Sequence, residues 1–132
     1  MKRSVFYFDD ESDLLEVFQM MFGDEYEVRT TTKLAEARRM LAECAADIII
    51  SNQSMPEISG SAFLHEVVKT CPRSLRIMST GYVGAGDMFT DVVAGLIDIF
   101  IPKPWDEKQM RQVLERASTV FESRRDASSD NF

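Results

Sequence analysis

The chain has 132 residues, of which 45% are hydrophobic and 28% are charged, and its formal net charge is −7. These values are typical of one soluble globular domain with a single core. The negative charge argues against direct nucleic-acid binding, and no apolar run is long enough to span a membrane. Because Cys44 and Cys71 have no metal-binding or redox spacing, we expect buried, reduced thiols and a cytoplasmic protein.

Short apolar runs that end in polar or turn residues alternate with segments of helical periodicity along the whole chain. The apolar runs predict strands at residues 5–8, 26–29, 48–50, 75–79 and 97–101. The periodic segments predict helices at residues 14–22, at 34–44 with Thr32 as the cap, at 63–71, at 88–94, and from near Asp106 to Phe121. We therefore assign residues 1–121 to one domain, and the polar residues 122–132 to a tail or the start of a linker.

This alternation predicts an α/β fold with a five-stranded parallel sheet covered on both faces. We expect a flavodoxin-like, doubly wound (βα)5 arrangement with strand order 2-1-3-4-5, which makes the first and third strands neighbours. Ligands of such sheets bind outside the carboxyl ends of the strands. The side chains at those ends are Asp9 and Asp10, Asn52, Thr80 and Lys103.

The chemistry of this set suits a divalent cation and a phosphoryl group. Two carboxylates, an amide oxygen and a loop carbonyl are ligands that Mg²⁺ accepts, while a lysine and a hydroxyl suit phosphoryl oxygens. Each feature alone also has an ordinary structural interpretation, such as carboxylates at a helix N-terminus, a Thr-Gly turn or a solvated lysine. Their joint placement at four strand ends favours a functional site.

Four motifs resemble the receiver domain of bacterial two-component response regulators, over residues 3–121. They are Phe8-Asp9-Asp10-Glu11, Asp47 through Met55-Pro56 to Gly60, Met78-Ser79-Thr80-Gly81-Tyr82, and Phe100-Ile101-Pro102-Lys103-Pro104-Trp105. The resemblance implies that Asp9, Asp10, Asn52 and the carbonyl of Ser54 face Mg²⁺. It further implies that Thr80 and Lys103 bind the phosphoryl oxygens, and that Phe100 is the aromatic residue that rotates with the signalling state.

The departure from the family is Asn52, which stands where the resemblance implies a phospho-acceptor aspartate. An acyl phosphate forms through attack by a carboxylate oxygen, and an amide oxygen is a far poorer nucleophile. We therefore predict no phosphorylation at Asn52, weaker Mg²⁺ binding and normal folding without metal. Three origins stay open: a natural atypical receiver, an engineered Asp-to-Asn substitution in an ordinary receiver, and an asparagine that is deamidated in the cell.

The resemblance also implies the partners. We expect a sensor histidine kinase or another signalling protein, and a homodimer through the face of the fourth helix, fifth strand and fifth helix, where Phe89 and Phe100 would lie. We expect no enzymatic activity. A haloacid-dehalogenase-like phosphatase is the alternative enzyme, but it requires Asp-x-Asp where this chain has Asp9-Asp10-Glu11.

Overall fold

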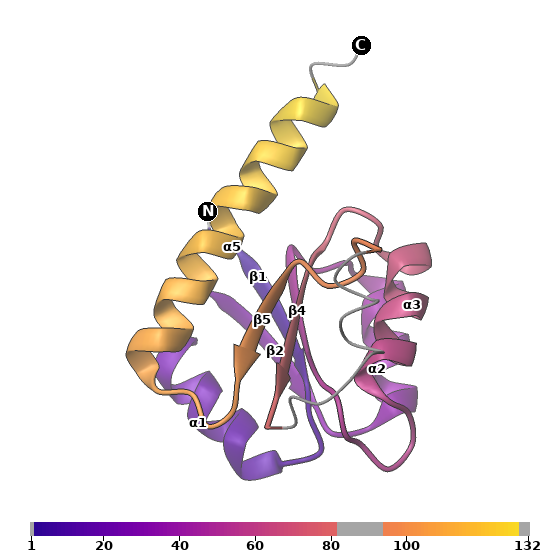
Figure 1. Cartoon of the computed structure of the whole chain (residues 1–132), viewed down its shortest axis with the longest axis vertical. Helices are drawn as coiled ribbons and strands as arrows, with labels where there is room; N and C mark the ends of the chain where they lie inside the picture. Colours follow the sequence, from indigo (N-terminus) through magenta and orange to yellow (C-terminus); the bar gives the residue numbers. More distant parts are fainter. Residues whose placement is uncertain (1, 82–93, 130–132) are drawn as a thin grey trace.

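Five parallel strands form one sheet in the order β2-β1-β3-β4-β5, as the sequence predicted (Figure 1). The computed structural model describes residues 2–81 and 94–129. The strands are β1 (Ser4–Phe8), β2 (Glu27–Thr31), β3 (Ile48–Asn52), β4 (Leu75–Thr80) and β5 (Ile99–Pro102). The helices are α1 (Ser12–Phe22), α2 (Leu34–Glu43), α3 (Gly60–Thr70) and α5 (Glu107–Ser129). The helix expected at 88–94 lies almost entirely outside the described residues.

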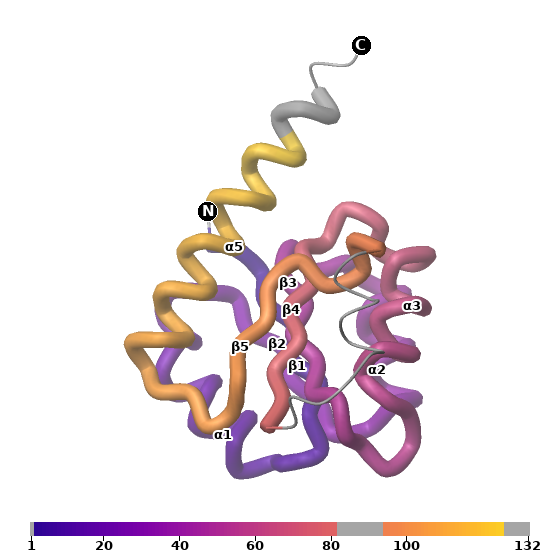
Figure 2. The backbone as a smooth tube through the Cα atoms, in the orientation of Figure 1, coloured from indigo at the N-terminus to yellow at the C-terminus, as the bar shows by residue number. Residues whose placement is uncertain are grey.

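Strand β3 is the central strand and pairs with β1 on one side and β4 on the other. Ile48, Ile49 and Ile50 are fully buried, as expected for β-branched residues in a strand covered on both faces. Figure 2 traces the backbone through these strands, and the register of the sheet places β3 between β1 and β4. This strand therefore delivers Asn52 to the middle of the sheet edge.

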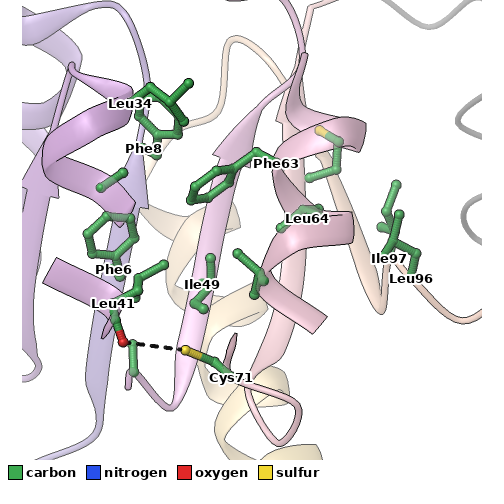
Figure 3. Packing of buried hydrophobic residues seen from close by; sticks show 14 residues of the cluster. Phe6, Phe8, Leu34, Leu41, Ile49, Phe63, Leu64, Cys71, Leu96 and Ile97 are labelled. Atoms are coloured by element: carbon green, nitrogen blue, oxygen red, sulfur yellow. Dashed lines mark hydrogen bonds between the residues drawn. The ribbon is translucent and has the colours of Figure 1, made fainter. Parts of the chain in front are cut away.

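The helices cover the sheet in two layers (Figure 1). On one face, α2 and α3 pack against Phe6, Phe8 and Ile49 in the cluster that Figure 3 draws. On the other face, α1 and α5 pack against alternate residues of the same strands, including Tyr7 and Ile50. Because successive strand side chains point to opposite faces, each inner strand contributes to both cores.

The start of α2 differs from the prediction. Thr32 is not the cap, because the helix begins at Leu34 after Lys33, which makes no side-chain capping bond. Instead, the N–H of Leu34 donates to Oε1 of Glu57 at 3.3 Å. A carboxylate from the loop before α3 thus satisfies a free N–H group of α2, which local sequence could not indicate. At α3, Ser59 accepts a capping bond from the N–H of Ala62 at 3.1 Å.

Helix α5 continues past Phe121 to Ser129, across residues expected to form a tail or linker. Arg124 pairs with Asp98, which precedes β5, and Glu122 pairs with Arg3 beside β1. These contacts with the body of the domain support helix in a segment whose composition is polar. In Figure 1 the end of α5 projects beyond the sheet.

The two cysteines lie at the ends of neighbouring helices. Cys71 is buried, as expected, and its thiol donates to the carbonyl of Leu41 at 3.8 Å (Figure 3). Cys44 is exposed, contrary to the expectation, because it follows the last turn of α2 as its C-cap. Among residues 2–81 and 94–129, no helix has the length and apolarity required to cross a membrane.

Candidate functional site

The carboxyl ends of four strands bring the predicted residues to one edge of the sheet. Phe8 pairs with Ser51 in the β1–β3 register, so Asp9, the next residue along, lies beside Asn52 at the end of β3. Thr80 pairs with Pro102 in the β4–β5 register, so Lys103 follows at the same level. The topology therefore assembles a single polar site from distant parts of the chain.

The Asn52 side chain acts as a hydrogen-bond donor toward the acidic side of the site. Its Nδ2 donates to Oδ1 of Asp10 at 3.1 Å and to the carbonyl oxygen of Ser54 at 2.9 Å. Asn52 is only 5% exposed, so these bonds satisfy a buried amide that would otherwise lose its contacts with water. The amide nitrogen thus joins two oxygens that were expected from the sequence to face a cation.

Asp9 and Lys103 form the second half of the site. The Asp9 side chain is fully buried, and its Oδ2 lies 2.8 Å from Nζ of Lys103. Its Oδ1 accepts a hydrogen bond from the backbone N–H of Glu11 at 3.0 Å. Burial raises the pKa of Asp9, and the contacts with Lys103 oppose that increase. The lysine therefore supplies the positive charge that a buried carboxylate requires.

Glu11 also reaches the lysine, with Oε2 at 3.5 Å from Nζ of Lys103. From the sequence, Glu11 was expected only as part of the acidic motif, without a contact to Lys103. Its position in the acidic run after the first strand was the available signal. Lys103 thus lies between two carboxylates, one buried and one exposed.

The loop after β3 is held tightly against the strand. A Cβ atom on Gly60 would lie 2.2 Å from the backbone oxygen of Asn52, so only glycine fits there without movement. The N–H of Gly60 donates to the carbonyl of Gln53 at 2.9 Å. Oε1 of Gln53 accepts from the N–H of Ser61, also at 2.9 Å. These contacts fix the backbone on both sides of the amide, and no local pattern in the sequence pointed to Gln53.

The remaining predicted residues line the β4–β5 side of the site. Thr80 is 1% exposed, and its carbonyl accepts from the N–H of Lys103 at 3.0 Å. Phe100 pairs with Met78 in the sheet register and is half-buried against the α2–α3 cluster. The structure therefore brings Asp9, Asp10, Asn52, Ser54, Thr80 and Lys103 to one edge, while Phe100 lies two residues before the end of β5.

Aromatic residues pack below the site on the α1–α5 face. Tyr7 precedes Asp9 by two residues on the same side of β1, and its ring makes an edge contact with Phe18 at 5.0 Å between centroids. Trp105 makes a similar contact with Phe18 at 6.0 Å. Burial raises the pKa of Tyr7 to about 12. A layer of packed aromatic rings therefore lies beneath the site.

Comparison with protein families identifies one model, described as the response regulator receiver domain, which matches residues 5–115. The chain is 31% identical over 102 residues to the hydrogenase transcriptional regulatory protein HoxA of Cupriavidus necator, with 77% of this chain and 21% of HoxA covered. It is 26% identical to the response regulator protein PilR of Pseudomonas aeruginosa, with 83% of this chain and 24% of PilR covered. The chain thus spans less than a quarter of the length of these relatives.

Solved structures share the fold. The signal receiver domain of an HD domain-containing protein from Pseudomonas fluorescens Pf-5 aligns with a TM-score of 0.86 at 22% identity, covering 93% of this chain and 99% of that chain. A CheY-like response regulator receiver domain protein from Methanospirillum hungatei JF-1 aligns with a TM-score of 0.83 at 20% identity, covering 96% of this chain and 99% of that chain.

Proposed function

The chain belongs to the response regulator receiver domain family, and we propose that it signals without phosphorylation at Asn52. It is a receiver domain of two-component response regulators, and this assignment does not favour the phosphatase alternative. We propose that its output is association with a partner or with a second copy. The relatives are much longer than this chain, and we do not extend their activities as whole proteins to it.

The observation that carries the proposal is the direction of the Asn52 amide. Its nitrogen donates to Asp10 and to the carbonyl of Ser54, whereas phosphoryl transfer requires an anionic oxygen at this position. Asn52 has no negative charge to attack phosphorus. It also cannot form the acyl phosphate that a carboxylate forms.

The donor set bears directly on Mg²⁺, which receiver domains generally bind at this site. The carboxylates of Asp9 and Asp10, the carbonyl of Ser54 and the amide oxygen of Asn52 have suitable chemistry for that ion. When bound, the ion would neutralise phosphoryl oxygens. In this chain the amide must turn away from Asp10 before its oxygen can face a cation, and the site has one negative charge fewer than an aspartate would give. We therefore propose weak Mg²⁺ binding.

Other side chains of the site have the positions required for phosphoryl recognition. We propose that Lys103 and Thr80 are the groups that would bind an oxyanion, and that Phe100 reports the state of the site to the surface. The ion pair between Lys103 and Asp9, at 2.8 Å, supports a resting state in which the site is neutralised from within. Such a site does not require metal in order to fold.

We propose a sensor histidine kinase or another signalling protein as the partner, and a homodimer formed through the face of β5, α5 and the segment between β4 and β5. Phe89, which was expected on this face, lies outside the described residues.

A protein of net charge −7 is not suited to bind nucleic acid directly. We propose no enzymatic activity, although one relative of this chain is named as a protein-glutamate methylesterase/protein-glutamine glutaminase. We propose a cytoplasmic location because kinase partners of receivers act there.

The test compares the chain with its Asn52→Asp variant. Each is incubated with Mg²⁺ and acetyl phosphate, and its intact mass is measured. We expect the mass of one phosphoryl group on the variant and no change in the original chain. An Asn52→Ala variant is the control and should also stay unmodified.

Two results would contradict the proposal. One is phosphorylation of the original chain, located by peptide mapping at Asn52 or at a neighbouring serine. The other is an association with a partner kinase that appears only after phosphoryl donor is added to the unmodified chain.

A further inference from the structure

A network of charged residues lies at the amino-terminal edge of the sheet, opposite the site. Arg76 is the second residue of β4 and is only 7% exposed. Its guanidinium donates to the carbonyls of Leu96 at 2.7 Å, Ser74 at 2.9 Å and Gly95 at 3.1 Å. A buried arginine that uses its donors on three carbonyls fixes the segment that leads into β5.

Asp98 connects this segment to β4 by reciprocal bonds. Its backbone N–H donates to the carbonyl of Arg76 at 2.8 Å, and its Oδ2 accepts from the N–H of Arg76 at 2.9 Å. The two side chains also form an ion pair at 3.9 Å, with each side chain 9% exposed. The Asp98 carboxylate is therefore held rigidly before β5 begins.

The same carboxylate binds the outer half of α5. Arg124 donates to Oδ1 of Asp98 at 2.5 Å and to Oδ2 at 3.1 Å, which is a bidentate contact. One turn earlier, Phe121 packs against the core, and the guanidinium of Arg3 lies 5.2 Å from its ring centroid. Arg3 in turn pairs with Glu122. After Phe121, the contacts of Glu122 and Arg124 with the body of the domain are ion pairs and not apolar packing.

We propose that Asp98 is a latch that couples the segment entering β5 to the outer half of α5, so that the two elements move together. Asp98 is the member that both arginines share, and β5 ends beside Lys103 of the site. A change in β5 would therefore reach α5 through a short, rigid, charged contact. The coupling uses residues outside the site and does not depend on the proposal for Asn52.

The pKa shifts of the two arginines agree with the contacts that Asp98 makes. Asp98 raises the pKa of Arg124 through its hydrogen bonds, so the pair holds the charged form. Burial lowers the pKa of Arg76, and Asp98 opposes that shift. Because Arg124 is partly exposed, at 44% of its side chain, salt should weaken its contact more than it weakens the buried one. The latch should therefore open first at Arg124.

The test is amide hydrogen exchange along α5, measured in the whole chain. In an Arg124→Gln variant, amides 119–125 should exchange about two- to fivefold faster, the effect expected of a partly exposed ion pair. Amides 108–114 should be unchanged. Raising the salt concentration of the original chain should reproduce part of this effect.

A matched control is available at the other end of the same helix. Arg111 pairs with Glu25 and Glu107, so Arg111→Gln removes a comparable ion pair from α5 without affecting Asp98. It should leave amides 119–125 unchanged. A second variant, Asp98→Asn, should accelerate exchange in both 119–125 and 96–99, because both arginines lose their shared partner.

Three outcomes would overturn the proposal. In the first, Arg124→Gln leaves exchange of amides 119–125 unchanged. In the second, it accelerates all of α5 equally, which would show only a general loss of stability. In the third, Asp98→Asn affects α5 but not the segment before β5.

Discussion

Replacing Asn52 by aspartate should change both the stability of the domain and its response to Mg²⁺. An Asn52→Asp variant loses the two hydrogen bonds that Nδ2 donates, at 3.1 and 2.9 Å. It also places a second negative charge beside Asp10. Loss of such bonds costs about 1–3 kcal/mol each, the larger value applying to a charged acceptor. Repulsion between carboxylates about 4 Å apart costs up to about 4 kcal/mol near a surface, and less where one can turn into solvent, as the exposed Asp10 can.

Even at the lower value for each bond, and with Asp10 turned into solvent, these effects predict a loss of at least about 2 kcal/mol from the free energy of unfolding in the absence of metal. For a chain of 132 residues, the unfolding entropy near the midpoint is about 0.28 kcal/mol/K, so Tm should fall by at least about 7 °C. Mg²⁺ at ten times its Kd should then return about 1.4 kcal/mol, or about 5 °C. The original chain should respond to Mg²⁺ by much less.

Thermal unfolding followed by circular dichroism, in EDTA and in Mg²⁺, measures both effects. Gln53→Glu is a suitable control, because it adds a carboxylate one residue away and keeps an oxygen that accepts from Ser61. It should show a small change in Tm and little response to Mg²⁺. Equal stability of Asn52→Asp and the original chain in EDTA, or an equal response of the two proteins to Mg²⁺, would contradict this prediction.

Three further predictions concern residues around the site. Gly60→Ala places a Cβ atom 2.2 Å from a backbone oxygen of β3 and should lower the free energy of unfolding by about 1–3 kcal/mol in urea titrations. The control is Gly81→Ala, whose Cβ atom would lie 3.9 Å from its nearest contact, and this variant should be nearly neutral. Burial raises the pKa of Tyr7 from 10.0 to about 12. The stability that depends on its protonated form is complete below pH 10 and is lost as the pH rises to 12, by about 3 kcal/mol. Tyr7→Phe should remove that part of the alkaline decline, and equal declines in the two proteins would contradict this. Lys103→Met leaves the buried carboxylate of Asp9 without its cation and should lower the free energy of unfolding by about 3–5 kcal/mol at neutral pH, measured by urea unfolding. A decrease below about 1 kcal/mol would show that the ion pair contributes little to stability.

Much of the fold was predictable because hydrophobic pattern and topology determine it. The run Ile48–Ile50 indicated a strand buried on both faces, and β3 lies at the centre of the sheet with these residues fully buried. Once the strand order was known, the residues after each strand had to meet at one edge. The grouping of the candidate site follows from that geometry, whereas the roles of its members stay predictions.

Details that depend on contacts between distant residues were not predictable. The first N–H of α2 bonds to Glu57, which lies 23 residues away, so the cap residue was placed wrongly. The polar residues after Phe121 are helical because Arg124 and Glu122 find partners on the body of the domain. The orientation of the Asn52 amide also depends on Asp10, across 42 residues. Local propensity contains no information on such pairs.

The amide at the end of β3 changes what kind of quantity the domain would measure. A covalent phosphoryl group has a lifetime, so an ordinary switch of this type reports the ratio of two rates, those of its attachment and its removal. Under the proposal for Asn52, a site that Asn52, Asp10 and Ser54 close with hydrogen bonds would carry no group with such a lifetime and would consume no energy. Its occupancy by a partner would follow mass action alone. Binding would then be reciprocal: a partner that changes the affinity of the domain for a second ligand would itself bind with an affinity changed by the same factor when that ligand is present.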